Sequence, residues 1–296
     1  LQYIVNKNKY KFGIRCPEFH SGSDIIGSEY YDYQFLNRMY IGVTGLRSMF
    51  NLHCGVLKSD TINEKAELQR VDESRKRICV ECNTDSFVPI IMSNKGKLIF
   101  NTNGEKKEVI YSSPYHYVNY RTPKGKFIIS SENEFRIGEL VPIIHDENRK
   151  KLVLNIFVDG LSQTVLENDF EKLMPHTYRF FKNGIQCTNA HTAGDWTFPS
   201  IASITTGQTL ARHKMLHSKI LRKIDEETPI LFEYFKNAGY NTTKIGGNWR
   251  IAPNYGYARG MNRVKYQHMY AGYSVEQVVA DVEEQIHCMA DTDQFI

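Results

Sequence analysis

The pattern of apolar and polar positions divides the chain into two halves. Before about residue 150, short runs in which apolar and polar residues alternate are rich in aromatic and β-branched side chains, which predicts strands. After that point, apolar runs typical of buried strands alternate with stretches of helical spacing. We therefore predict a β-rich domain over residues 1–150 and an α/β domain over residues 151–296, joined near the polar segment "DENRKK".

The first half contains two turn signals and several strand-like runs. Asn103-Gly104 lies between alternating runs and predicts a two-residue hairpin turn, and Pro123-Lys124-Gly125 predicts a second hairpin. The runs "FVPIIMS" and "FRIGELVPII" predict further strands, whereas "KAELQRVDESRKR" is a candidate helix. These features are typical of a small β-sandwich-like module.

The second half alternates strands and helices. "LVLNIFV" at residues 152–158 predicts a strand buried on both faces, and "IQCTNAHT" at 185–192 predicts the second strand. A helix is expected from Phe170 to Phe181, and later helices are closed by Gly207 and by Gly239. "YNTTKI" predicts a third strand, and "DQFI" begins a fourth. The helix before "DQFI" has an apolar face formed by Val275, Val278, Val279, Val282 and Ile286. This alternation predicts a parallel sheet.

Composition and charge exclude some classes of partner. The 41% hydrophobic and 12% aromatic residues indicate a globular protein, and the net charge of +4 is too weak to predict nucleic-acid binding. No apolar run reaches the roughly 20 residues of a membrane-spanning helix. The sequence begins without Met and stops at "DTDQFI" in mid-pattern, so we expect a fragment. Its first residues carry no export signal, and its compartment and oligomeric state are left open.

The cysteines are predicted to be reduced and structural. Cys79 and Cys82 form the only C-x-x-C, without a second pair or a His pair to complete a zinc site. Cys187 and Cys288 lie in apolar surroundings of the sequence and are expected to be core thiols.

Two polar residues are expected at the carboxyl ends of the predicted strands, where parallel sheets bind ligands. Asp159 follows the first strand, and Thr197 lies between the second strand and the next helix, so both are expected at one site. Thr197 is either a helix cap or a nucleophile at a helix N-terminus, where anions bind. Asp159 is either a turn-capping residue or a metal ligand.

Three segments together carry a family resemblance: "LNIFVDG", "HTAGDWTFPSIASITTG" and "NAGYNTTKIG". In this order and spacing they resemble the sulfatase-like branch of the alkaline phosphatase superfamily, over roughly residues 151–296. The resemblance implies the N-terminal part of an α/β/α sandwich with a site for divalent metal, two ions of Zn, Mn, Ca or Mg. It implies that Asp159 is a metal ligand and that Thr197 is both a metal ligand and the nucleophile. The family's remaining ligands lie downstream of a strand like the one that begins at "DQFI".

The sequence also departs from the sulfatase pattern. Sulfatases carry Cys or Ser where Thr197 stands and Arg where Ile201 stands, so maturation to formylglycine is not implied. A direct Thr nucleophile is more similar to the phosphodiesterases and phosphoethanolamine transferases of the superfamily. The family's "GKWH" segment corresponds to "GNWR" at 247–250, where Asn248 and Arg250 are candidate substrate-binding residues. A guanidinium binds oxyanions bidentately, and an exposed loop arginine is the alternative.

These residues predict a metal-dependent hydrolase or transferase of sulfate or phosphate esters. A free Thr hydroxyl is a poor nucleophile at neutral pH, and metal coordination makes its alkoxide accessible. The substrate would be a small-molecule or glycan ester, and the reaction would pass through a covalent Thr197 ester. The alternative is a non-catalytic sulfatase-like protein that binds a glycan or an envelope polymer. A Rossmann protein is excluded because no strand is followed by G-x-G-x-x-G. By resemblance, the compartment would be periplasmic, extracellular or membrane-associated.

Overall fold

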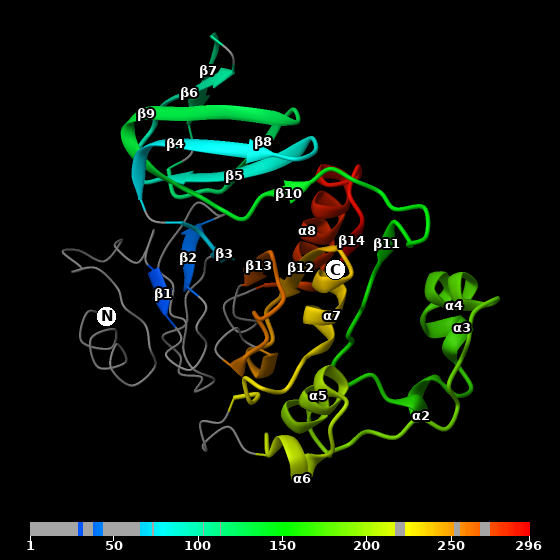
Figure 1. Cartoon of the computed structure of the whole chain (residues 1–296). Coiled ribbons are helices and arrows are strands. Elements are labelled where there is room, and N and C mark those ends of the chain that lie inside the picture. The colour runs from blue at the N-terminus through cyan, green and yellow to red at the C-terminus, as the bar shows by residue number, and fades with distance from the viewer. Residues whose placement is uncertain are drawn as a thin grey trace.

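The structure, a computed structural model, contains two β-sheets, one of which is flanked by helices (Figure 1). The predicted mixed α/β character is therefore confirmed. Within the described part of the chain, none of the helices has both the length and the apolar character that crossing a bilayer requires. The structure describes residues 29–31, 38–43, 66–72, 74–102, 104–112, 114–216, 223–251, 255–266 and 273–296.

Seven strands between residues 75 and 142 form one connected antiparallel sheet, which we call the antiparallel sheet and which lies at the top of Figure 1. Its order is β10-β5-β9-β6-β7, with β4 paired to β9 and β8 paired to β5. Its inward side chains, among them Val88, Leu98 and Ile129, are fully buried in one apolar cluster, and removing that surface from water stabilises the sheet. The strands are β4 (Arg75–Cys82), β5 (Ser86–Met92), β6 (Gly96–Thr102), β7 (Glu105–Tyr111), β8 (Val118–Thr122), β9 (Gly125–Ile137) and β10 (Val141–Pro142).

The two predicted hairpins have different outcomes. β6 and β7 pair up to Thr102 and Glu105, and Gly104 between them has a φ of 93°, so this hairpin is confirmed. The second hairpin is wrong, because β8 pairs with β5 whereas β9 pairs with β4, β5 and β6. The backbone N–H of Lys124 donates to Asp85 Oδ1 across 2.9 Å, which holds the β8–β9 connection against the start of β5.

The second sheet, which we call the mixed sheet, joins strands from both halves of the chain. Its order is β1-β2-β3-β13-β12-β14-β11. The strands β11 to β14 pair in parallel, and β1 to β3 add to β13 in antiparallel fashion. The strands are β1 (Glu29–Tyr31), β2 (Arg38–Val43), β3 (Ala66–Gln69), β11 (Leu152–Val153), β12 (Asn241–Gly246), β13 (Arg263–Tyr266) and β14 (Gln294–Phe295).

The position of β3 corrects one prediction. The candidate helix "KAELQRVDESRKR" contains β3 and the start of β4 instead. Glu67 of β3 is 1% exposed and pairs with Arg263 of β13 across 2.6 Å, a contact that the local sequence cannot reveal. The domain division at residue 150 stays a prediction, although β1 to β3 from the first half extend the sheet of the second half.

Helices cover both faces of the mixed sheet. Neighbouring residues on a strand point to opposite faces. On one face, Val264 lies in an apolar cluster against which Phe232 of α7 packs. On the other face, Arg263 donates to Gln285 of α8 across 2.6 Å. The helices are α2 (Gln163–Leu166), α3 (Phe170–Leu173), α4 (Pro175–Phe181), α5 (Thr197–Thr206), α6 (Leu210–His213), α7 (Leu231–Asn237) and α8 (Val275–Cys288), with a short 3-10 helix, η1 (Trp249–Ile251).

The first two strands predicted for the second half are shortened or absent. β11 has only two residues, and residues 154–158 are exposed and outside any strand. Residues 185–192 are also exposed and form no strand. Among the described strands, β11 pairs with β14 alone, and the N–H of Asn155 donates to the carbonyl of Ile296 just beyond this pairing. A strand needs a neighbour for its backbone groups, and no described strand lies beside the rest of this run.

One predicted helix is broken in the structure, and the ends of two others are as predicted. The helix predicted from Phe170 to Phe181 is broken into α3 and α4 at Met174, because Pro175 excludes helical backbone from the residue before it. The ends of α5 and α7 are confirmed: Gly207 has a φ of 68° and follows α5 directly, and a glycine with positive φ also follows α7.

The predicted apolar face of α8 is only partly buried, because Val278, Val282 and Ile286 are half-buried whereas two of its valines are exposed. Val275 is 76% exposed and Val279 is 48% exposed, whereas Asp281 and Gln285 are buried against the mixed sheet. The sheet presents charged side chains on this side, so polar residues of α8 pack there as well.

The cysteines correct another prediction. Cys187 and Cys288 are exposed, so they are not core thiols, because their loop and helix end lie on the surface. Cys79 is exposed and Cys82 is buried, because an odd separation along β4 places them on opposite faces. The C-x-x-C therefore forms no redox or metal pair.

Charged side chains join the antiparallel sheet to the mixed-sheet region. Arg121 of β8 lies 2.9 Å from Asp291, and Lys236 of α7 lies 2.5 Å from Glu139. These ion pairs surround the connection over residues 143–150 that leads from one sheet to the other.

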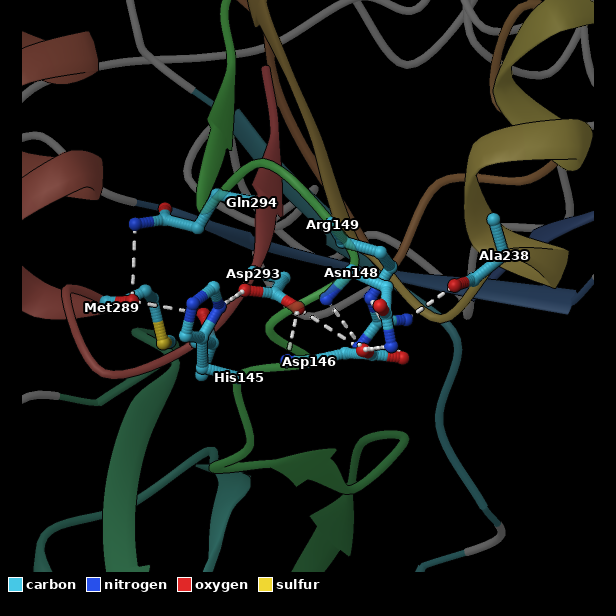
Figure 2. Close-up of polar contacts among 9 residues, drawn as sticks. His145, Asp146, Asn148, Arg149, Ala238, Met289, Asp293 and Gln294 are labelled. Atoms are coloured by element: carbon cyan, nitrogen blue, oxygen red, sulfur yellow. Dashed lines mark hydrogen bonds and ion pairs between the residues drawn. The ribbon is translucent and has the colours of Figure 1, made fainter.

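Asp293, directly before β14, is the centre of the polar group in Figure 2. Its side chain is fully buried, and its oxygens lie 2.5 Å from His145 Nδ1, 3.0 Å from the backbone nitrogen of Asp146 and 2.8 Å from Arg149 Nη2. Burial opposes ionisation of this carboxyl, but the hydrogen bonds from Asp146 and His145 and the Arg149 charge outweigh it and lower the pKa of Asp293. Arg149 also donates to the carbonyl of Ala238 at the end of α7.

Candidate functional site

Three segments that are distant in the sequence meet at one polar group. Thr197, the first residue of α5, donates from Oγ1 to Asp159 Oδ1 across 2.8 Å. Asn248, between β12 and η1, donates from Nδ2 to Asp159 Oδ2 across 2.9 Å. Asp159 and Thr197 therefore share one location, as expected from their places in the sequence. Their chemical roles remain predictions.

Thr197 does not act as a helix cap. The N-cap of α5 is Trp196, with extended backbone at φ −151° and ψ 168°, and its side chain makes no capping hydrogen bond. The Thr197 hydroxyl is directed at Asp159 instead, across the N-terminus of α5. The first backbone N–H groups of a helix lack intrahelical acceptors and carry its positive dipole end, so this position favours an oxyanion.

The turn before α5 is fixed by close packing and by one buried hydroxyl. A Cβ on Gly194 would lie 2.8 Å from Pro199 Cγ, so only glycine fits there without a shift. The Ser200 hydroxyl lies 2.9 Å from the carbonyl oxygens of both Gly194 and Trp196. Together these contacts determine where Thr197 enters the helix.

Arg250 borders the site beside an aromatic ring. Its backbone N–H donates to Asn248 Oδ1 across 3.0 Å, which orients the amide so that its nitrogen faces Asp159. Its guanidinium carbon lies 6.0 Å from the centre of the Trp196 ring. Arg250 is half-buried, which corrects the alternative of an exposed loop arginine.

Lys244 of β12 is a residue that the sequence analysis missed. Its Nζ donates to the carbonyl of Ile251 at the end of η1 and lies 5.7 Å from the centre of the Tyr257 ring. Burial lowers the pKa of Lys244 to about 7. This side chain supports the segment that carries Asn248 and Arg250. The sequence signal that could have identified it was a lysine within the predicted strand "YNTTKI".

The nearby histidines have supporting or surface positions. His213 is buried; its Nδ1 accepts from the backbone N–H of Met215 across 3.0 Å, so Nε2 carries the hydrogen and donates to Ser203 Oγ across 2.9 Å. Burial lowers the pKa of His213, in keeping with this neutral form. His191 is exposed and bonded within its own loop. His217 lies outside the described residues.

The oxygen atoms of Asp159 and Thr197 are of the chemical types that bind divalent cations. Carboxylate and hydroxyl oxygens are ligands that Mg²⁺, Ca²⁺ and Mn²⁺ accept. Across the described ranges, however, no group of three or more His, Cys, Asp or Glu side chains converges. Asp159 and Thr197 would together supply two oxygen ligands, fewer than the three protein ligands of a typical catalytic metal site.

A hydroxyl, a carboxylate and an amide meet at the N-terminus of α5, and the amide lies just beyond the carboxyl end of the parallel strand β12. Residues 151–296 match the family model named Sulfatase. This part of the chain belongs to the sulfatase-like branch of the alkaline phosphatase superfamily, so the resemblance seen in its sequence is confirmed. No curated protein matches the chain.

Two solved structures show weak similarity to parts of the chain. A cupin superfamily protein from Desulfitobacterium hafniense is 14% identical, with 34% of this chain and 72% of that chain covered and a TM-score of 0.17. A mutant of CBM29-2, a family 29 carbohydrate binding module, is 12% identical, with 43% and 79% covered and a TM-score of 0.16. These TM-scores are too low to support a conclusion about fold or function.

Proposed function

We propose that the protein cleaves or transfers sulfate or phosphate esters through a covalent ester on Thr197. The observation that carries this proposal is the hydrogen bond from Thr197 Oγ1 to Asp159, at the N-terminus of α5. A helix cap would have its hydroxyl on the first-turn amides, whereas this hydroxyl is shared with a carboxylate.

In the proposed reaction, Thr197 Oγ1 attacks the phosphorus or sulfur atom of the ester. Its proton passes to Asp159 Oδ1, the acceptor at 2.8 Å. The bond from the central atom to the leaving alcohol breaks, and the alcohol oxygen takes a proton from water. Water or an acceptor alcohol then displaces Thr197, whose oxygen takes back the proton from Asp159, and the attacking water or alcohol releases its own proton to the solvent. The first amides of α5 and the Arg250 guanidinium would stabilise the oxyanion.

A bound divalent cation would lower the pKa of the Thr197 hydroxyl and offset the charge of the transferred group. Asp159 and Thr197 are the residues of this chain that we assign as its ligands. Asn248 holds the second carboxylate oxygen, so its amide would orient Asp159 toward Thr197.

The first test compares turnover of p-nitrophenyl phosphate and p-nitrophenyl sulfate by three variants in the presence of Zn²⁺, Mn²⁺ or Mg²⁺. Thr197→Ala should lower kcat/KM about a thousandfold or more, because it removes the attacking atom. Thr197→Ser keeps a hydroxyl and should retain part of the activity. Thr209→Ala removes an exposed hydroxyl without a capping contact and should leave the rate unchanged.

Full activity of folded Thr197→Ala would contradict the proposal. No turnover of either ester by the unaltered protein would instead favour the non-catalytic glycan-binding alternative.

A further inference from the structure

The β3–β4 connection, which leads from the mixed sheet to the antiparallel sheet, borders a cavity of about 520 Å³. It lies between the β3–β4 connection, the β9–β10 connection and the middle of β4, and the first two touch through a bridge between Val71 and Gly138. Its volume is within the usual range for small-molecule sites. The cavity is separate from the group around Thr197, so binding of a ligand in it is independent of the proposed ester chemistry.

Arg70 is a cation at this cavity whose charge is not balanced by any residue that the structure describes. Its Nε is buried without a hydrogen bond, and within the described residues its guanidinium makes no hydrogen bond or ion pair. Arg149 and Arg259 also bury an unbonded Nε, but their terminal nitrogens pair with Asp293 and Glu233. A half-buried guanidinium is costly to leave unpaired, which points to an anionic ligand.

The carboxylates at the same cavity are already neutralised. Asp72 lies 3.6 Å from Arg75, and Glu81 lies 3.3 Å from Lys126. The third carboxylate of the lining, Glu139, lies 2.5 Å from a lysine of α7. Among the described residues of the lining, Arg70 is therefore the charged side chain without a partner of opposite charge, and an anionic ligand would supply that partner.

The other residues that line the cavity indicate the chemistry of the uncharged part of the ligand. Ile78, Ile137 and Leu140 provide an apolar wall, and the paired carboxylates still offer oxygens that accept hydrogen bonds. A sugar ring has an apolar face and hydroxyl donors at its edge. We propose that this cavity, which we call the Arg70 pocket, binds an acidic sugar, with its carboxylate, sulfate or phosphate on Arg70.

Cys79 provides a direct readout, because it is one of the residues that line the Arg70 pocket and its thiol is exposed. The rate of its alkylation by iodoacetamide is measured by peptide mass spectrometry, with the exposed Cys187 and Cys288 as internal references. Glucuronate should slow the alkylation of Cys79 alone. Neither glucose, which lacks the charge, nor acetate, which lacks the ring, should protect it at the same concentration.

Two variants assign the effect to one side chain. Arg70→Gln should weaken protection by glucuronate about tenfold or more, because a hydrogen bond to a charged partner is lost. Arg77→Gln makes the same change at an exposed position of β4 outside the cavity. In this variant, glucuronate should protect Cys79 as well as it does in the unaltered protein. The proposal is overturned if glucuronate leaves Cys79 unprotected in the unaltered protein. Equal protection by acetate or glucose, or undiminished protection in Arg70→Gln, would overturn it as well.

Discussion

At the scale of single residues, the candidate site depends on contacts that position Thr197 without touching a substrate. Gly194 and Ser200 fix the turn, and Asp159 takes the hydroxyl. These residues share one property: each removes an alternative position for Thr197. Ordering this turn costs conformational entropy, and the burial of Pro199 and Ser200 in the first turn of α5 offsets that cost.

Gly194→Ala should lower both stability and activity. The new methyl would meet Pro199 Cγ at 2.8 Å, and overpacking of this kind costs about 1–3 kcal/mol. Urea unfolding and kcat/KM on the better of the two esters measure the two effects. Gly246→Ala is the matched control, because nothing lies within 4 Å of the position a Cβ would take there. Equal values for both glycine variants would show that the turn tolerates the shift.

The sequence predicted the members of the site better than their supports. Asp159 and Thr197 are recognisable because a polar residue that ends an apolar run and a hydroxyl at a helix start are local signals. The roles of Gly194 and Lys244 depend on what lies opposite them in space, Pro199 and η1, and no local pattern contains that information.

At the scale of elements, β3 is joined to the mixed sheet by a buried ion pair. Glu67 accepts from Arg263 Nε across 2.6 Å and from Nη2 across 2.8 Å. Burial opposes the charge on Arg263, but its attraction to Glu67 outweighs burial and raises its pKa. Gln285 of α8 accepts from the same guanidinium. A strand, a neighbouring strand and a helix therefore share one charged group.

Glu67→Ala should destabilise the protein by about 3–5 kcal/mol, because it leaves Arg263 buried without its counter-ion. The control is Glu108→Ala, which breaks an exposed pair with Lys97 and should cost less than about 1 kcal/mol. The free energies are compared by urea unfolding. A change at Glu67 as small as that at Glu108 would mean that β3 contributes little to the stability of the mixed sheet.

Element prediction succeeded where the signal was local. The β6–β7 hairpin and the ends of α5 and α7 follow from turn and capping residues. Element prediction failed where the pairing of a strand with a distant segment decides whether the strand forms. Residues 154–158 read as a buried strand, yet only two residues of β11 have a described neighbour. The polarity of the sheet surface added Asp281 and Gln285 to the buried face of α8, which the spacing of apolar residues did not predict.

At the scale of the whole molecule, the polar group around Asp293, which we call the charged junction, and the candidate site lie at opposite ends of the parallel strands of the mixed sheet. Asp293 precedes β14, whereas Asn248 follows β12, and the two strands are parallel. Figure 1 shows the antiparallel sheet at one end of the molecule and α5 toward the other. The Arg70 pocket also lies at the junction. An acidic sugar bound there would therefore sit at a distance from Thr197.

Stability should depend on the ionisation of Asp293. Its pKa is lowered in the folded state, so its contribution is complete above the unfolded value of about 3.9 and is lost as the pH falls below it. Asp293→Asn should be much less stable than the unaltered protein at pH 7, and the difference should shrink toward about pH 3. Asp291→Asn, at a half-exposed pair with Arg121, should change stability by less than about 1 kcal/mol. A difference for Asp293→Asn that does not vary with pH would exclude this account of the junction.

The central claim is that Thr197 carries the transferred group, and the most direct measurement is the mass of its peptide. The protein is mixed with p-nitrophenyl phosphate or p-nitrophenyl sulfate and a divalent cation, quenched in acid during turnover, digested and analysed by mass spectrometry. We predict one added phosphoryl or sulfuryl group on Thr197 and none on Thr209. Turnover without modification of Thr197, or with modification at another residue, would contradict the claim.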